Sequence, residues 1–134
     1  MNEKMSAEMV RAIEWDCTRL VSHYALLNDA ARWVEASALF LADGRLARPS
    51  APDAPIVGRE AILAAFLARP PRVTRHVCSN IVIDVIGPDA ARGESAMLLF
   101  TSTDAPPLVG GFIDRFARTA EGWRFAERRG TLSF

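Results

Sequence analysis

The sequence lacks the features that mark several whole classes of protein. It contains two isolated cysteines, Cys17 and Cys78, which excludes a disulfide framework or a cysteine metal site and is typical of a reducing compartment. Lys4 is the single lysine and lies in a terminus expected to fray, which excludes Schiff-base chemistry on a buried lysine. No apolar run approaches the roughly 20 residues that cross a bilayer, and the polar start does not resemble a signal peptide. We therefore expect a cytoplasmic protein without membrane contact.

An excess of charge of one sign is also missing. The 16 basic and 16 acidic side chains balance, so the sequence offers no basic surface for the phosphates of a nucleic acid. It has no glycine-rich phosphate loop, no nucleophile elbow and no paired Cys or His metal motif, so we expect no cofactor and no metal. The length of 134 residues, 50% of them hydrophobic, predicts a single domain over residues 1–134.

Helical periodicity dominates the first half of the chain. Apolar residues recur every three or four positions and predict a long amphipathic helix from about Ser6 to Leu27. Asn28 and Asp29 are strong N-cap types, so we expect a break there and a second helix that continues through Phe40. This half is completed by a turn at 43–44, a proline-containing loop at 49–55 and a third helix between Gly58 and Pro70.

From residue 73 the pattern changes to alternating, β-branched residues separated by short turns. It predicts four strands in series, at about 73–86, 91–103, 108–118 and 123–132. Serial strands with short turns pair as an antiparallel meander, and the apolar face of such a sheet must be covered by the three helices. The sequence thus predicts an α+β fold in which helices half-cover a curved sheet and leave a pocket between them.

One predicted strand carries a small, polar row. His76 shares its face with Thr74, Cys78 and Asn80, while alternation puts Ile81 and Ile83 on the opposite face. The row is either a pocket wall or a solvent-facing surface, and a single histidine does not decide between them.

A carboxylate stands in an aromatic row on the third predicted strand. Asp114 shares its face with Phe112 and Phe116, where a charged group needs a partner. We expect an ion pair with Arg128 or Arg129 on the next strand, and a role as a second acid in the pocket is the alternative.

Five segments together resemble a known family. The chain is similar to the SnoaL-like branch of the nuclear transport factor 2-like superfamily in NDAARW (28–33), VGREAI (57–62), TRHVCSN (74–80), GFIDRF (111–116) and GWRF (122–125). The resemblance implies a cone-shaped fold: a curved, mostly antiparallel sheet wrapped around the long N-terminal helix, two further helices, and an apolar pocket in the cone.

Within that superfamily the chain is similar to scytalone dehydratase and the bile-acid 7α-dehydratases. The similarity implies that Asp29 and His76 project into the pocket as an acid-base pair and that Tyr24 is the pocket tyrosine. Thr101 falls near the position where scytalone dehydratase carries a second histidine. The resemblance therefore does not imply that this chain acts on the substrate of scytalone dehydratase. The candidate substrate-binding residues are Trp33, Asn80, Thr101, Phe112 and Asp114, although the helical spacing of Trp33 is also typical of a core residue.

Two functions from different classes follow. The first is a cofactor-independent lyase (dehydratase) or isomerase acting on an apolar cyclic or polyketide-like molecule, in which Asp29 and His76 exchange a proton and Tyr24 donates to the oxyanion. The second is a non-catalytic small-molecule-binding or oligomerisation domain, in which Asp29 only caps a helix and His76 only forms a hydrogen bond. Because relatives assemble through their sheets, we also expect a homodimer or homotrimer that covers outward residues such as Ile113.

Overall fold

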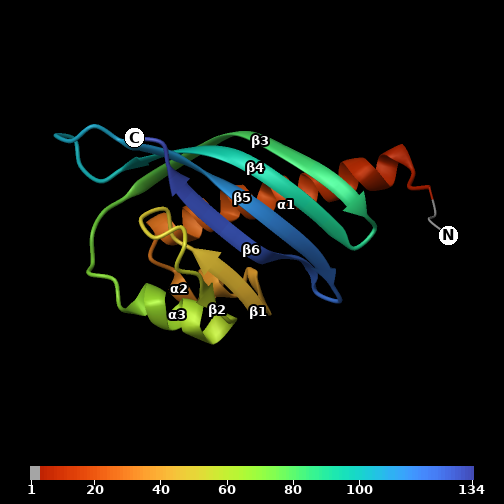
Figure 1. Ribbon diagram of the computed structural model, residues 1–134, viewed down its shortest axis with the longest axis horizontal. Helices are drawn as coiled ribbons and strands as arrows, with labels where there is room; N and C mark the ends of the chain where they lie inside the picture. The colour runs from red at the N-terminus through yellow and green to blue at the C-terminus, as the bar shows by residue number, and fades with distance from the viewer. Residues whose placement is uncertain (1–3) are drawn as a thin grey trace.

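A six-stranded sheet curves across one long helix in the computed structural model, which describes residues 4–134 (Figure 1). The polar start noted above lies partly outside these residues, at positions 1–3. The elements are the helices α1 (Ala7–Asp29), α2 (Trp33–Ser37) and α3 (Arg59–Leu67) and the strands β1 (Phe40–Ala47), β2 (Ile56–Val57), β3 (Arg75–Gly87), β4 (Ala90–Phe100), β5 (Leu108–Thr119) and β6 (Gly122–Leu132).

The sheet is mixed, with strand order β2-β1-β6-β5-β4-β3. The long strands β3 to β6 form the predicted antiparallel meander, and β1 joins it by pairing parallel to β6. The helix α1 runs along one face of these strands, while α2, α3 and β2 gather beside β1 (Figure 1). The predicted α+β architecture with helices covering one face of a curved sheet is confirmed.

The first helix is longer at its end than the sequence indicates. The Ser6 hydroxyl accepts a hydrogen bond from the amide of Met9 and caps the start, as its residue type predicts. The break predicted at Asn28 and Asp29 comes slightly later, because α1 continues to Asp29 and α2 begins at Trp33, and the Asn28 side chain donates back to the carbonyl of Tyr24 at 3.2 Å. The chain turns only at Ala31, whose φ of 56° is left-handed. Among residues 4–134, no helix is both long and apolar enough to cross a membrane.

The segment after α2 also differs from the prediction. Phe40 does not end a helix but begins β1, and residues 43–44 are not a turn between elements but lie inside that strand. The register of β1 against β6 shifts between Phe40 and Arg45, so the strand bulges where the Asp-Gly pair occurs. The apolar residues before the bulge have helical spacing, so the sequence predicts a helix there. The strand β1 forms because it pairs with β6, which is distant in the sequence.

A second bulge overturns the assignment of faces on β3. Asn80 has a φ of 53°, and the register against β4 shifts between Ser79 and Val82. The extra residue reverses the alternation, so Ile81 and Ile83 pack into the same core as Cys78, contrary to the expectation that they point away from the His76 face. One inner face thus combines the polar row near the start of β3 with apolar packing further along.

Candidate active site

Asp29 and His76 meet where the end of α1 touches the start of β3. The Asp29 Oδ1 atom lies 2.6 Å from Nδ1 of His76, and the Thr74 hydroxyl donates to the same oxygen at 2.9 Å. The backbone N–H of His76 donates to Asp29 Oδ2 at 2.8 Å. The two side chains are only 7% and 15% exposed respectively, so the pair is well shielded and held from several directions.

This arrangement determines the chemistry available to the imidazole. A carboxylate can only accept hydrogen bonds, so Asp29 holds a proton on Nδ1 of His76. The other ring nitrogen, Nε2, is then free to accept a proton. Asp29 is therefore not the cap of a second helix, which was the alternative explanation for its position, because α2 has no side-chain cap.

Tyr24 lies one and a half turns before the end of α1, in an aromatic cluster. Its ring centre is 5.9 Å from that of Phe40, 5.8 Å from Phe125 and 6.4 Å from Phe112. Burial raises the pKa of Tyr24, and the nearby Arg128 guanidinium acts in the opposite direction. The phenol therefore keeps its proton at neutral pH and is a hydrogen-bond donor.

Asp114 pairs with Arg128, one of its two expected partners, and this prediction is confirmed. Arg128 Nε lies 3.3 Å from Asp114 Oδ1, and the two side chains are 0% and 1% exposed respectively. Arg129 instead contacts Asp53 on the surface. Burial raises the pKa of Asp114 to about 6, against the opposing effect of Arg128.

The buried pair is polar but poorly satisfied. Within residues 4–134, neither Asp114 oxygen and none of the three Arg128 nitrogens has a hydrogen-bond partner of acceptable geometry, and the same holds for the Ser95 hydroxyl. The Arg128 guanidinium carbon instead lies 3.7 Å from the centre of the Phe112 ring and 4.6 Å from that of Tyr24. The core on the inner face of the sheet thus holds a cation among aromatic rings.

Cys78 lies on the strand that carries His76. It follows His76 by two residues on the same face of β3 and packs against the core. Burial raises the pKa of the Cys78 thiol, with an opposing contribution from Arg128 and reinforcing ones from Asp114 and Asp29. Cys78 therefore connects the strand that carries His76 with the core cluster that contains Tyr24.

The remaining substrate-binding candidates fall into two groups, one in the core and one on the surface. Phe112 and Asp114 belong to the buried cluster, and Trp33 packs against Phe66 with ring centres 5.4 Å apart. Asn80 is exposed at its bulge, and Thr101 lies beyond the end of β4, where it is exposed. Both residues stay candidates: Asn80 is exposed at the bulge, and Thr101 directly follows Phe100, the register partner of Arg75, near the start of β3.

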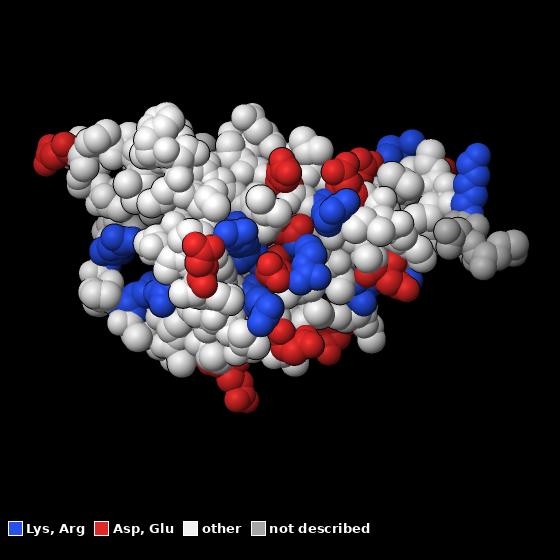
Figure 2. Space-filling view, viewed as in Figure 1, with Lys and Arg blue, Asp and Glu red and all other residues white. Residues whose placement is uncertain are grey.

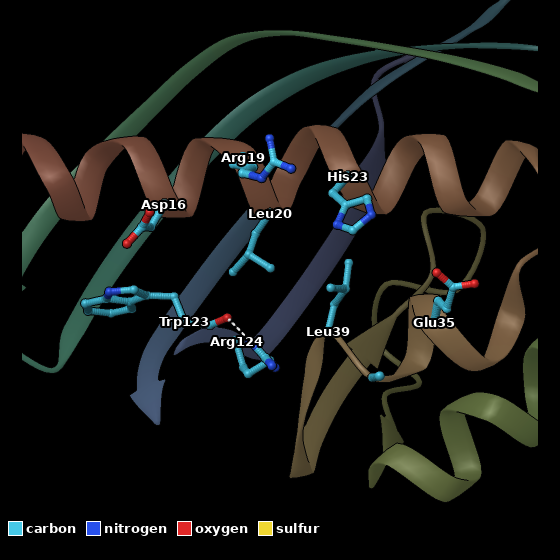
Figure 3. A pocket seen from close by; sticks show the side chains of 9 residues that line it. Asp16, Arg19, Leu20, His23, Glu35, Leu39, Trp123 and Arg124 are labelled. Atoms are coloured by element: carbon cyan, nitrogen blue, oxygen red, sulfur yellow. Dashed lines mark hydrogen bonds between the residues drawn. The ribbon is translucent and has the colours of Figure 1, made fainter. Parts of the chain in front are cut away.

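A separate cleft of about 420 Å³ opens between α1, α2 and β6. Figure 3 shows Asp16, Leu20 and His23 reaching from α1 toward Leu39 and Trp123. None of Tyr24, Asp29 and His76 lines this cleft, so it is not the pocket implied by the resemblance. Across residues 4–134, no three Cys, His, Asp or Glu side chains are grouped to hold a metal ion.

Two residues of the site were missed as functional candidates. Thr74 bonds to Asp29, and its position two residues before His76 on the predicted face was the available signal. Arg69 donates from Nη1 to Asn28 Oδ1 at 2.9 Å, next to Asp29 in the sequence. No local pattern indicates Arg69, because the contact joins α1 to the residues after α3, 41 positions apart.

Comparison with solved structures shows the same fold in several proteins. The structure of "Putative Scytalone Dehydratase" from Novosphingobium aromaticivorans has a TM-score of 0.83 and 22% identity, over 96% of this chain and 89% of that chain. A hexachlorocyclohexane dehydrochlorinase of type 2 has a TM-score of 0.84 and 14% identity, over 96% and 90%. A protein of unknown function from Mycobacterium tuberculosis has a TM-score of 0.80 and 25% identity, over 98% and 78%.

Comparison by sequence identifies the family. No curated protein matches the chain. The family model described as "SnoaL-like domain" matches residues 11–129, which include every helix and strand from the first turns of α1 to most of β6. The expected resemblance is thereby confirmed, and the chain belongs to the SnoaL-like domain family.

Proposed function

We propose that this chain is a cofactor-independent lyase or isomerase that removes a proton from the carbon next to a carbonyl group of an apolar cyclic or polyketide-like substrate. The observation that carries the proposal is the 2.6 Å contact between Asp29 Oδ1 and His76 Nδ1. It supplies an oriented general base whose charge, once protonated, is balanced by the adjacent carboxylate.

The proposed reaction uses three groups. His76 Nε2 takes the proton, the C–H electron pair moves toward the carbonyl, and Asp29 stabilises the resulting imidazolium. Tyr24, whose phenol is protonated at neutral pH, donates to the developing oxyanion. In an elimination the electron pair then expels a hydroxyl group, which leaves as water with the proton from His76. In an isomerisation the same proton returns at another carbon.

The named structural neighbours favour elimination. One is called a dehydratase and another a dehydrochlorinase, and both names describe loss of a small group together with a proton. Their identities of 22% and 14% show a shared fold alone, so they support the class of reaction and not the substrate.

The alternative, a binding domain without catalysis, is favoured by a different observation. The Arg128 guanidinium lies 3.7 Å from the centre of the Phe112 ring and 4.6 Å from that of Tyr24, and both Arg128 and Tyr24 are buried. A cluster packed in this way is typical of a stable protein interior and offers a ligand little access to Tyr24.

Proton exchange tests the proposal without knowledge of the natural substrate. We expect the wild-type chain to catalyse deuterium uptake into a bicyclic ketone such as tetralone or chromanone in deuterium oxide, followed by proton NMR. Asp29→Asn and His76→Gln should each lower the rate by about a hundredfold or more. The control is His23→Gln, which changes the other histidine, in the separate cleft. If all four proteins exchange at one common rate, the Asp29–His76 pair is not a catalytic base.

A further inference from the structure

Arg69 lies just beyond the end of α3, beside the last turn of α1. Its Nη1 atom donates to Asn28 Oδ1 at 2.9 Å. Its guanidinium carbon lies 4.7 Å from the centre of the Phe66 ring and 5.4 Å from that of Trp33. The cation thus contacts two aromatic rings and the neutral side-chain amide of Asn28, the residue that directly precedes Asp29.

This arginine has no carboxylate partner. In the ion pairs formed within residues 4–134, acidic side chains pair with other arginines or with His76, and none pairs with Arg69. A guanidinium has five N–H donors, of which Asn28 and Tyr24 together occupy at most two. Unused donors on a half-buried, oriented cation are an unusual feature, because such groups normally find an anion.

Other groups act on Arg69 in both directions. Burial lowers the pKa of Arg69, Tyr24 raises it, and Arg48 and Arg72 lower it further. A bound anion would relieve the repulsion among the three guanidiniums. The Phe66 ring that Arg69 contacts has its centre 6.4 Å from that of Tyr24, so Arg69 borders the aromatic cluster of the proposed site.

We propose that Arg69 binds a carboxylate group of the substrate, with the partly exposed Trp33 ring contacting the apolar part next to it. The inference rests on the proposed function and narrows its substrate class to apolar cyclic acids. A carboxylate matches the fork of N–H donors on a guanidinium and forms two parallel hydrogen bonds with it. The apolar remainder of the substrate would then extend toward the Asp29–His76 pair.

A purely structural role for Arg69 makes a different prediction. The last turn of α1 contains no basic residue, and its free carbonyl groups carry partial negative charge that Arg69 could balance. In that case any effect of removing the cation appears in stability and does not depend on whether a ligand is charged.

A matched pair of ligands separates the two roles. Naphthoate and naphthamide of the same isomer have nearly the same shape and differ in one negative charge, and their affinities are measured by isothermal titration calorimetry. We expect the wild-type chain to bind naphthoate at least tenfold more tightly than naphthamide, which is about the strength of one charge-assisted hydrogen-bond pair. Arg69→Gln should lower naphthoate affinity by about tenfold and leave naphthamide affinity unchanged.

Two further variants complete the design. Arg69→Lys keeps the charge but not the fork and should retain part of the preference for naphthoate, which also keeps the test valid if Arg69→Gln does not fold. Arg92→Gln removes an exposed arginine from the outer face of β4 and should leave both affinities unchanged.

Equal binding of naphthoate and naphthamide by the wild-type chain would overturn the proposal, as would an equal loss of both ligands in Arg69→Gln. Competition by millimolar inorganic phosphate with no preference for naphthoate would show a general anion site and would overturn the carboxylate assignment. Binding is measured without turnover, so its failure is distinguishable from a failure of the proton-exchange experiment.

Discussion

The Asp29 carboxylate oxygen Oδ1 lies 2.6 Å from Nδ1 of His76, although 47 residues separate the two in the sequence. This contact joins the C-terminal end of α1 to the first residues of β3, and Thr74, immediately before β3, reinforces it. Asp29 is the last residue of α1, so the contact is made by the part of the helix that extends beyond the predicted end at Leu27.

Thr74→Val tests whether the carboxylate must be held in position. The substitution removes the hydroxyl donor to Asp29 while keeping the branched shape of the side chain. We expect proton exchange to fall about tenfold, because a less oriented carboxylate holds the imidazole less well, and stability to change by about 1 kcal/mol. Thr103→Val, in the exposed loop after β4, is the control. An unchanged exchange rate in Thr74→Val would show that the threonine does not position Asp29.

Asp114 makes stability depend on pH. Its pKa is raised from 3.8 to about 6 by burial, so the folded chain keeps this proton longer than the unfolded chain. The stabilising contribution is therefore complete below about pH 4 and is lost as the pH rises through about 6. The loss amounts to about 3 kcal/mol at pH 7 and above.

The Asp114→Asn variant lacks this titration and provides the comparison. We expect the free energy of unfolding of the wild type minus that of the variant to decrease as the pH rises from 4 to 7, measured by urea unfolding at several pH values. A difference that stays constant over this range, or that increases, would mean that pairing with Arg128 outweighs burial in setting the pKa.

At the bulge, the backbone conformation of Asn80 determines which substitutions are tolerated. A residue with a φ of 53° is strained unless it is glycine, asparagine or aspartate. We expect Asn80→Val to lower the free energy of unfolding by about 1–2 kcal/mol and Asn80→Gly to leave it nearly unchanged. Ser79→Val, at the preceding exposed position, is the control. Equal effects of the two valine substitutions would exclude backbone strain as the cause.

Much of the fold could be predicted because the information is local. The four long strands were predicted within about three residues of their ends, since alternation and turn residues mark each of them. The strand β1 was not predicted, because its pairing with β6 is parallel and joins distant segments. The reversal of faces at Asn80 escaped for a similar reason, as a bulge adds one residue without changing the composition of the strand.

The candidate site could also be predicted only in part. Asp29, His76 and Tyr24 were named from a resemblance, and the contact between Asp29 and His76 is now visible in atomic terms. The enclosing cluster was only partly foreseen. Arg128 was expected to pair with Asp114, but its position over the rings of Phe112 and Tyr24 depends on a register shift in β6 that the sequence does not reveal.

The outer face of the sheet predicts self-association. Val77, Leu98 and Val109 are register partners on β3, β4 and β5, and Val77 is 45% exposed. Figure 2 shows few charges over this part of the molecule, near the ends of the strands closest to the C terminus. An apolar row across three strands is expected to be covered by a second copy of the chain.

Val77→Lys tests this expectation. We predict that the wild type sediments as a dimer or trimer at micromolar concentration and that Val77→Lys shifts it toward the 14.7 kDa species. Val34→Lys, at an exposed valine of α2, introduces the same charge elsewhere and should leave the assembly intact. A wild type that sediments only as the 14.7 kDa species would show that water tolerates the apolar row.

Tyr24→Phe separates packing from chemistry at the centre of the proposed site. The substitution keeps the ring that packs 5.9 Å from Phe40 and 5.8 Å from Phe125, and removes only the hydroxyl. Since burial raises the pKa of Tyr24, the hydroxyl is protonated and available to donate to an oxyanion. Loss of one such donor costs about a hundredfold in rate, so we expect proton exchange to fall by that factor while the free energy of unfolding changes by less than about 1 kcal/mol. Phe40→Leu, which disturbs the same ring cluster without touching a hydroxyl, should lower stability by about 1 kcal/mol or more and affect exchange much less. If Tyr24→Phe exchanges at the wild-type rate, the tyrosine belongs to the core alone, and the oxyanion must be stabilised by another group.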